Sequence, residues 1–117
     1  MREPVQRVAK PWGHELLIAH TESYVGKILV IEPGEALSLQ LHRVKDETFH
    51  VVRGEIELVV EEEGVLVAQP LRPGESYRVP AGTRHRMIAG PEGCELFEVS
   101  TPHLEDVVRL EDRYGRS

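Results

Sequence analysis

Four residues with metal-ligating side chains stand out by their type and spacing. Gln40 and His42 lie two residues apart in a segment of alternating apolar residues, so both side chains point to the same face of a strand. Glu47 begins the next such segment and shares a face with Phe49, where a buried carboxylate needs a partner or a bound cation. His85 begins a third segment of this kind. Together they offer two imidazole nitrogens, one carboxylate and one amide oxygen, a set that suits Zn, Mn, Fe, Co or Ni better than Ca or Cu(I).

A framework of strands must position these side chains, and the sequence predicts one. Apolar residues alternate with period two, and β-branched residues are common, in eight segments: Lys27–Ile31, Ser38–His42, Thr48–Val52, Glu55–Val60, Val65–Leu71, Ser76–Val79, His85–Ala89 and Glu95–Ser100. Residue pairs that favour turns separate them: Pro33-Gly34, Arg53-Gly54, Glu63-Gly64, Pro73-Gly74, Ala81-Gly82 and Gly90-Pro91. Only the tail, from Leu104 to Tyr114, carries a weak helical pattern. We therefore expect an all-β sandwich or barrel.

The composition limits the class of protein. The chain has 117 residues, with 14 Lys+Arg against 20 Asp+Glu and a net charge of −6. This size supports one core, so we expect a single domain. We find no apolar stretch that could span a membrane and no signal-peptide pattern, and we expect a soluble, cytoplasmic protein. The lone Cys94 leaves no internal disulfide, and the negative charge, without a basic cluster, argues against nucleic-acid and anionic-membrane partners. The absence of Asn and the excess of Arg over Lys favour a heat-adapted source.

Two gapped motifs in this sequence resemble those of the cupin superfamily. The first is matched by Gly34, Gln40, His42, Glu47 and Gly54, with Gln40 where the family pattern has a histidine. The second is matched by Gly74, Pro80, Gly82 and His85. Glutamine at that place is similar to the phosphomannose isomerases, and further segments resemble their type II branch: Pro11-Trp12-Gly13, Ser38-Leu39-Gln40, Pro80-Ala81-Gly82 and the tail Val108–Arg116.

The resemblance implies a fold, a cofactor and a reaction. The fold would be a double-stranded β-helix, or jelly-roll barrel, in one domain over residues 1–117, with the barrel at about 24–100, an N-terminal arm at 1–23 and a tail at 101–117. One divalent metal ion, with Zn favoured over Mn, Co, Fe or Ni, would be held by Gln40, His42, Glu47 and His85. The reaction would interconvert mannose 6-phosphate and fructose 6-phosphate through an enediolate. Most type II relatives join this domain to a mannose-1-phosphate guanylyltransferase, which this sequence lacks, so we expect no nucleotidyl transfer. Single-domain cupins often pair, so we expect a homodimer.

A phosphorylated sugar also needs a cation for its phosphate and a base for its proton. The resemblance favours Arg109 for the phosphate, with Arg86 and Lys45 as further candidates. By strand alternation Arg86 points away from His85, and Arg109 has acidic neighbours with which it could pair instead. The sequence does not identify the base, which could be metal-bound hydroxide, Glu47, or a lysine or glutamate elsewhere in the chain.

The same residues also allow simpler interpretations. Each candidate ligand, taken alone, could be an ordinary hydrogen-bonded side chain. The whole chain could be a non-catalytic sugar or metabolite binder, or a small oxygenase that uses Fe or Ni. We expect Trp12 to plug one end of the barrel and His50, which alternates out of phase with Glu47, to lie on the outer face of the sheet.

Overall fold

The computed structural model describes residues 1–117, which form nine antiparallel strands in one curled sheet and no helix. The strands are β1 (Gln6–Lys10), β2 (Gly13–His20), β3 (Val25–Ile31), β4 (Leu39–Leu41), β5 (Glu47–Glu62), β6 (Val65–Leu71), β7 (Ser76–Val79), β8 (His85–Ser100) and β9 (Val108–Glu111). The expected all-β fold is confirmed. With no helix formed, none is available that could cross a lipid bilayer.

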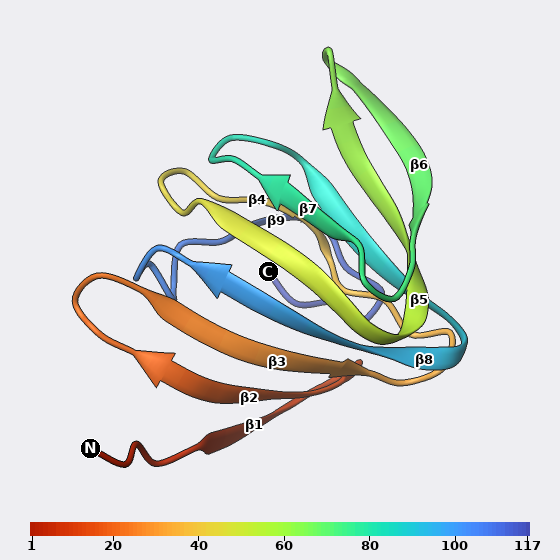
Figure 1. The fold of residues 1–117 in the computed structure, drawn as a ribbon. Coiled ribbons are helices and arrows are strands. Elements are labelled where there is room, and N and C mark those ends of the chain that lie inside the picture. The colour runs from red at the N-terminus through yellow and green to blue at the C-terminus, as the bar shows by residue number, and fades with distance from the viewer.

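The two long strands β5 and β8 run through both layers of the curled sheet (Figure 1). In one layer, the first part of β5 pairs with β7 and with the last part of β8, and β3, β2 and β1 follow in order. In the other layer, the last part of β5 pairs with β6 and with the first part of β8, beside which β4 and β9 lie. One bent pair of strands therefore joins the two layers of the jelly roll.

The bend of this strand pair depends on two facing glycines. Arg53-Gly54 and Gly90-Pro91 were expected to be turns between strands, and this expectation is wrong, because both pairs lie within continuous strands. The register between β5 and β8 shifts on either side of Gly54, which has a φ of +73°. A Cβ at Gly54 would lie 2.1 Å from the carbonyl oxygen of Gly93. The strands therefore bulge and bend where the predicted turns would have ended them.

A side chain at this bend is expected to destabilise the protein. Gly54→Ala should lower the free energy of unfolding by about 2–3 kcal/mol, because it adds both backbone strain and a clash with Gly93. Gly64→Ala is the matched control, because Gly64 also has a positive φ, of +80°, but faces open space. Urea denaturation of the two variants measures the difference. Equal losses in the free energy of unfolding would show that the clash with Gly93 does not add to the destabilisation of Gly54→Ala.

Four of the other predicted turns are confirmed by their backbone. At Pro33-Gly34 and Pro73-Gly74 the glycine has a positive φ, and the next residue donates its N–H back to Glu32 or Arg72 respectively, as in a type II turn. At Ala81-Gly82, Thr83 donates to the carbonyl of Pro80. At the tip of the β5–β6 hairpin, Glu63 and Gly64 both have positive φ values, which defines a type I′ turn.

The two ends of the chain contribute strands that lie outside the eight predicted segments. Residues 6–20, in the expected arm, form the hairpin β1–β2, which pairs with β3. Residues 108–111, where the weak helical pattern lies, form β9 and pair with β4. The helical interpretation of the tail is therefore wrong, because an open sheet edge at β4 supplies backbone partners for an extended chain.

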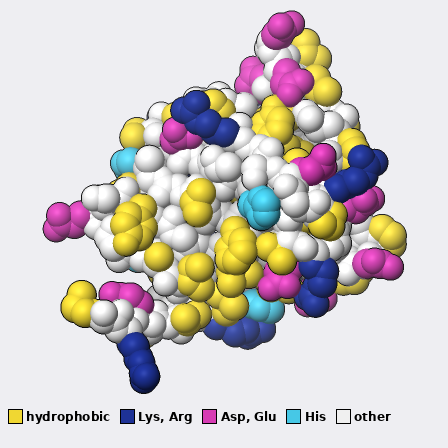
Figure 2. Space-filling view, in the orientation of Figure 1, with side chains coloured by type: hydrophobic (Ala, Val, Ile, Leu, Met, Phe, Trp, Pro, Cys, Tyr) yellow, Lys and Arg dark blue, Asp and Glu magenta, His cyan; other side chains and the backbone are white.

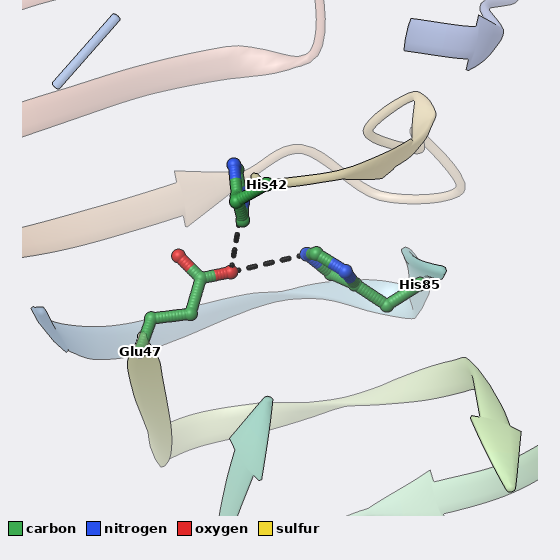
Figure 3. Close-up of side chains that lie close together, drawn as sticks. All are labelled: His42, Glu47 and His85. Carbon is green, nitrogen blue, oxygen red and sulfur yellow. Dashed lines mark hydrogen bonds and ion pairs between the residues drawn. The ribbon is translucent and has the colours of Figure 1, made fainter. Parts of the chain in front are cut away.

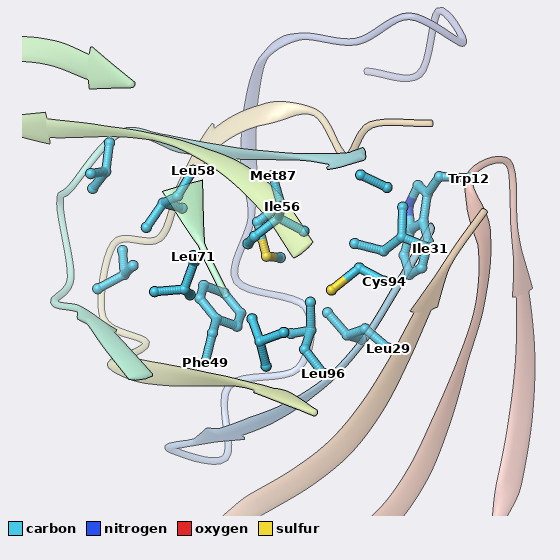
Figure 4. Packing of buried hydrophobic residues seen from close by; sticks show 14 residues of the cluster. Trp12, Leu29, Ile31, Phe49, Ile56, Leu58, Leu71, Met87, Cys94 and Leu96 are labelled. Atoms are coloured by element: carbon cyan, nitrogen blue, oxygen red, sulfur yellow. The ribbon is translucent and has the colours of Figure 1, made fainter. Parts of the chain in front are cut away.

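The core between the two layers is apolar and closely packed (Figure 4). It contains Phe49, Ile56, Leu58, Met87 and Leu96 among 14 buried residues. Trp12 closes one side of this cluster and is 3% exposed, as expected of a plug. His50 is exposed, also as expected, and its ring bonds the hydroxyl of Ser76. The core fixes the strand ends at which the candidate metal ligands lie.

Candidate metal centre

Three of the predicted ligands meet at one buried point (Figure 3). His42 follows β4, Glu47 begins β5 and His85 begins β8. The Oε1 atom of Glu47 lies 3.2 Å from Nε2 of His42 and 3.0 Å from Nε2 of His85. All three side chains are buried, with exposures of 3% or less. The curl of the sheet thus brings together residues that lie 43 positions apart in the chain.

The two histidine rings are oriented by backbone carbonyls. Nδ1 of His42 lies 2.5 Å from the carbonyl oxygen of Asp106, and Nδ1 of His85 lies 2.9 Å from that of Thr83. A carbonyl only accepts hydrogen bonds, so each Nδ1 must carry the proton and donate it. Each Nε2 is then left with a lone pair that points toward Glu47. This arrangement is the usual support for metal-binding histidines.

This donor set fits a divalent metal ion. Two lone pairs that face a carboxylate repel one another unless a cation lies between them, and buried Nε2 of His85 makes no hydrogen bond. Ligand atoms at about 2.0–2.2 Å from a tetrahedral metal lie about 3.3 Å apart, close to the 3.2 and 3.0 Å that separate Oε1 of Glu47 from the two Nε2 atoms. Two imidazoles and a carboxylate are also the ligands that zinc and related ions favour. The trio can therefore hold a metal ion.

Protons compete for the same atoms. Burial opposes a charge on His42, but the hydrogen bond and charge of Glu47 outweigh it and raise the pKa of His42 above its ordinary value. Burial likewise opposes ionisation of Glu47, yet His42 and His85, which can donate to it when their Nε2 atoms are protonated, and the charge of Lys45 hold its pKa well below the usual range. Metal affinity at such a site falls as the pH falls, because the ligands must be deprotonated.

Gln40 lies beside the trio on the neighbouring strand. Its backbone pairs with His85, and its side chain lines the same cavity as His42. The Oε1 atom of Gln40 accepts a hydrogen bond of 2.8 Å from the hydroxyl of Ser38, which fixes the orientation of the amide. The side chain that the sequence predicts as a fourth ligand thus lies at the edge of the buried trio.

Lys45 links the trio to a further buried carboxylate. Its Nζ atom lies 3.0 Å from Oε2 of Glu47 and 3.1 Å from Oε2 of Glu98. Burial would lower the pKa of Lys45, but the charges of Glu98 and Glu47 outweigh this and raise it. The ammonium is therefore charged and engaged by two carboxylates, and its predicted role in phosphate binding stays a prediction.

His42 and Gln40 line a polar cavity of about 90 Å³, which has room for several water molecules. Its lining has a basic excess: the basic residues are Lys10, Lys27, Lys45, Arg109 and Arg116, and the acidic ones are Glu15 and Glu98. The chain as a whole carries a net charge of −6. This local reversal of sign favours an anionic ligand.

The two arginines predicted to bind phosphate lie in different places. Arg109, on β9, lines the cavity, and its Nη1 donates to the carbonyl oxygen of Ser117 while its buried Nε has no partner. Arg86 lies outside the cavity lining and donates to the carbonyls of Leu37 and Glu111. Arg86 thus holds backbone segments together, in agreement with the strand alternation that points it away from His85.

Asp106 fixes the loop that carries Lys45. Its carboxylate accepts hydrogen bonds from the backbone N–H groups of Arg43, Val44 and Lys45 at 2.8–3.0 Å. These bonds, of which the one from Lys45 is the strongest, lower the pKa of Asp106 from 3.8 to about 2. The same residue orients His42 through its backbone carbonyl. Asp106 is therefore a positioning residue for the site.

Asp106→Ala is expected to lower the free energy of unfolding by about 1–2 kcal/mol at neutral pH, because three N–H groups lose their acceptor. A carboxyl whose pKa is lower in the folded protein stabilises it above its ordinary pKa. The difference between the wild type and the variant should thus shrink as the pH falls from 4 toward 2. Urea denaturation at several pH values measures it, and a pH-independent difference would contradict the role of the ionised carboxylate.

Several residues of the site were missed by the sequence analysis although a signal was present. Lys27 lies in the same strand face as Leu29 and Ile31, and Glu98 lies in the same face as Leu96, so both share an inward face with core residues. This is the argument that identified Glu47. Arg116 gave no such signal, because its segment lies beyond the last strand.

The fold and this site define a cupin. The cupin-domain family model matches residues 27–100, and the chain belongs to this family. The mannose-1-phosphate guanylyltransferase ManC of Salmonella typhimurium is 37% identical over 115 residues, which make up 95% of this chain and 23% of that protein. The chain thus spans about a quarter of that relative's length.

Solved structures agree with this fold. KdgF from Halomonas sp. superposes with a TM-score of 0.72 at 22% identity, covering 86% of this chain and 89% of that one. The capsular polysaccharide assembling protein CapF from Staphylococcus aureus gives a TM-score of 0.80 at 18% identity, covering 94% of this chain and 33% of that one. Both likenesses concern the fold alone.

Proposed function

We propose that this protein is a metal-dependent isomerase that interconverts mannose 6-phosphate and fructose 6-phosphate. The observation that carries this proposal is the buried trio His42, Glu47 and His85, of which His42 lines a cavity with an excess of basic residues. The similarity to the guanylyltransferase ManC supports a substrate from mannose metabolism. Residues His42, Glu47 and His85, with Gln40 beside them, would hold the ion.

The residues of the cavity have separate tasks in this reaction. When bound, a divalent metal supplies a Lewis acid that stabilises negative charge on the sugar oxygens. Arg109 has a buried, unpartnered N–H and offers it to an anionic group such as the phosphate. Leu104 and Val107 of the tail supply apolar surface to the lining of the cavity.

The direct test is turnover of mannose 6-phosphate by protein loaded with Zn, Mn or Co, followed by the appearance of fructose 6-phosphate. Unphosphorylated mannose is the matched substrate, and a much lower kcat/KM for it is expected if the basic cavity binds the phosphate. Failure to convert mannose 6-phosphate with any divalent metal would refute the proposal.

A non-catalytic sugar binder is the second candidate. It is favoured by the ion pairs that already engage Lys27 with Glu15 and Arg116 with Asp112, because they leave few free groups for chemistry. A binder would show an increase in melting temperature with mannose 6-phosphate but no turnover. An oxygenase would consume O₂, which an oxygen electrode detects.

We also propose a homodimer. Val52, Phe97 and Val99 lie on the outer face of β5 and β8 and are between 38% and 58% exposed. Figure 2 shows hydrophobic side chains gathered over β3 and β8 on this face. A second copy of the same face would cover them. Light scattering should give the mass of two chains, and the mass of one chain would contradict the proposal.

A further inference from the structure

Glu98 is a buried carboxylate that is not among the three residues placed to hold a metal ion. It lies on the inward face of β8, opposite Lys27 of β3, and is 6% exposed. Its side chain lines the cavity together with Gln40 and His42. The ammonium of Lys45 contacts both Glu98 and Glu47, and so holds Glu98 next to the trio. A carboxylate at this position faces the same cavity as two of the predicted ligands, Gln40 and His42, where the sugar would bind.

The other ionisable groups of the cavity are less suited to accept a proton from carbon. Glu47 faces the two histidines of the trio. Lys45 is charged and bound by two carboxylates. Glu15 lies 3.2 Å from Lys27 and 3.9 Å from Lys10, so two cations share its charge. Glu98 remains.

The surroundings of Glu98 also suit this role. Burial, followed by the charge of Glu47, raises the pKa of Glu98 above its ordinary value, against the opposing charges of Lys45 and Lys27. A carboxylate with a raised pKa is a stronger base than an exposed one, and its neutral acid is stable enough to hold a proton between two steps.

We propose that Glu98 is the catalytic acid–base residue that carries the proton between C2 and C1 of the sugar, an inference that rests on the proposed isomerase function. The carboxylate takes the proton from C2 of the open-chain aldose. The C–H electron pair forms the C1=C2 double bond, and the carbonyl electrons move to O1. After the hydroxyl proton of O2 passes to O1, the neutral acid returns its proton to C1, and C2 becomes the carbonyl of the ketose.

Glu98→Gln tests this inference because it keeps the shape of the side chain and removes the base. We expect kcat to fall at least about 100-fold, in the range of general acid–base catalysis, while KM, metal content and the melting shift with mannose 6-phosphate stay close to wild type. Glu95→Gln is the matched control, since Glu95 lies on the outer face of β8 and pairs with Arg53. Its kcat should be unchanged.

The outcomes separate this inference from the proposed function. If the wild type converts mannose 6-phosphate and Glu98→Gln keeps kcat within tenfold, Glu98 is not the base. If Glu98→Gln fails to fold or to bind the metal, Glu98→Asp replaces it: a lowered kcat with an unchanged KM supports the role, and a wild-type kcat overturns it. If the wild type itself has no turnover, the isomerase proposal fails and the role of Glu98 falls with it.

Discussion

His85→Ala is expected to abolish turnover and to weaken the binding of divalent metal at least about 100-fold. Loss of a residue that only supports a ligand typically costs 10- to 100-fold in affinity, so loss of a ligand should cost more. His85 contributes one of the two Nε2 atoms that face Glu47, and its Nδ1 is already committed to Thr83. Calorimetric titration of the metal-free variant with Zn²⁺ or Co²⁺ measures this loss.

The matched control for this variant is His50→Ala. His50 is exposed on the outer face, where it bonds Ser76, so its removal should change neither metal affinity nor turnover. Wild-type metal affinity in His85→Ala, or an equal loss in both variants, would contradict the assignment of the trio.

Lys45→Met is expected to lower the free energy of unfolding of the metal-free protein by about 3–5 kcal/mol. Removing one partner of a buried ion pair leaves the other charge uncompensated, and here two carboxylates lose the same cation. Urea denaturation in the presence of a chelator measures this loss. Adding Glu98→Gln to Lys45→Met should recover part of the stability, because one uncompensated charge is then removed.

Lys10→Met is the control for this prediction. Lys10 lies at the rim of the same cavity, 3.9 Å from Glu15 and 28% exposed, so its ion pair should contribute less than about 1 kcal/mol. Losses of similar size for Lys10→Met and Lys45→Met would contradict the prediction, because burial of the ion pairs of Lys45 would then add nothing to the free energy of unfolding.

The trio could be predicted from the sequence because its members lie in strands with clear alternation or at their starts. His42 and Glu47 each conflict with the apolar pattern around them, and such conflicts are typical of functional sites. The turns at Gly34 and Gly74 could be predicted for a similar reason, since a glycine after a proline favours one turn type.

Other features depend on tertiary contacts that no local pattern records. Gly54 has the sequence of a turn, but pairing with β8 on both sides keeps the chain in one strand. β9 forms because β4 offers an edge to an otherwise weakly patterned tail. The sequence also does not show that the loop of Lys45, held by Asp106, places the ammonium between the buried carboxylates Glu47 and Glu98.

The central claim is that the buried trio holds one divalent metal ion. Elemental analysis of the purified protein, after loading and dialysis, tests it most directly when a Gln40→Ala/His85→Ala variant is analysed alongside. We expect about one metal ion per chain in the wild type and none in the variant. A wild-type protein that cannot be loaded with any divalent metal, or a variant that keeps a full equivalent, would contradict the claim.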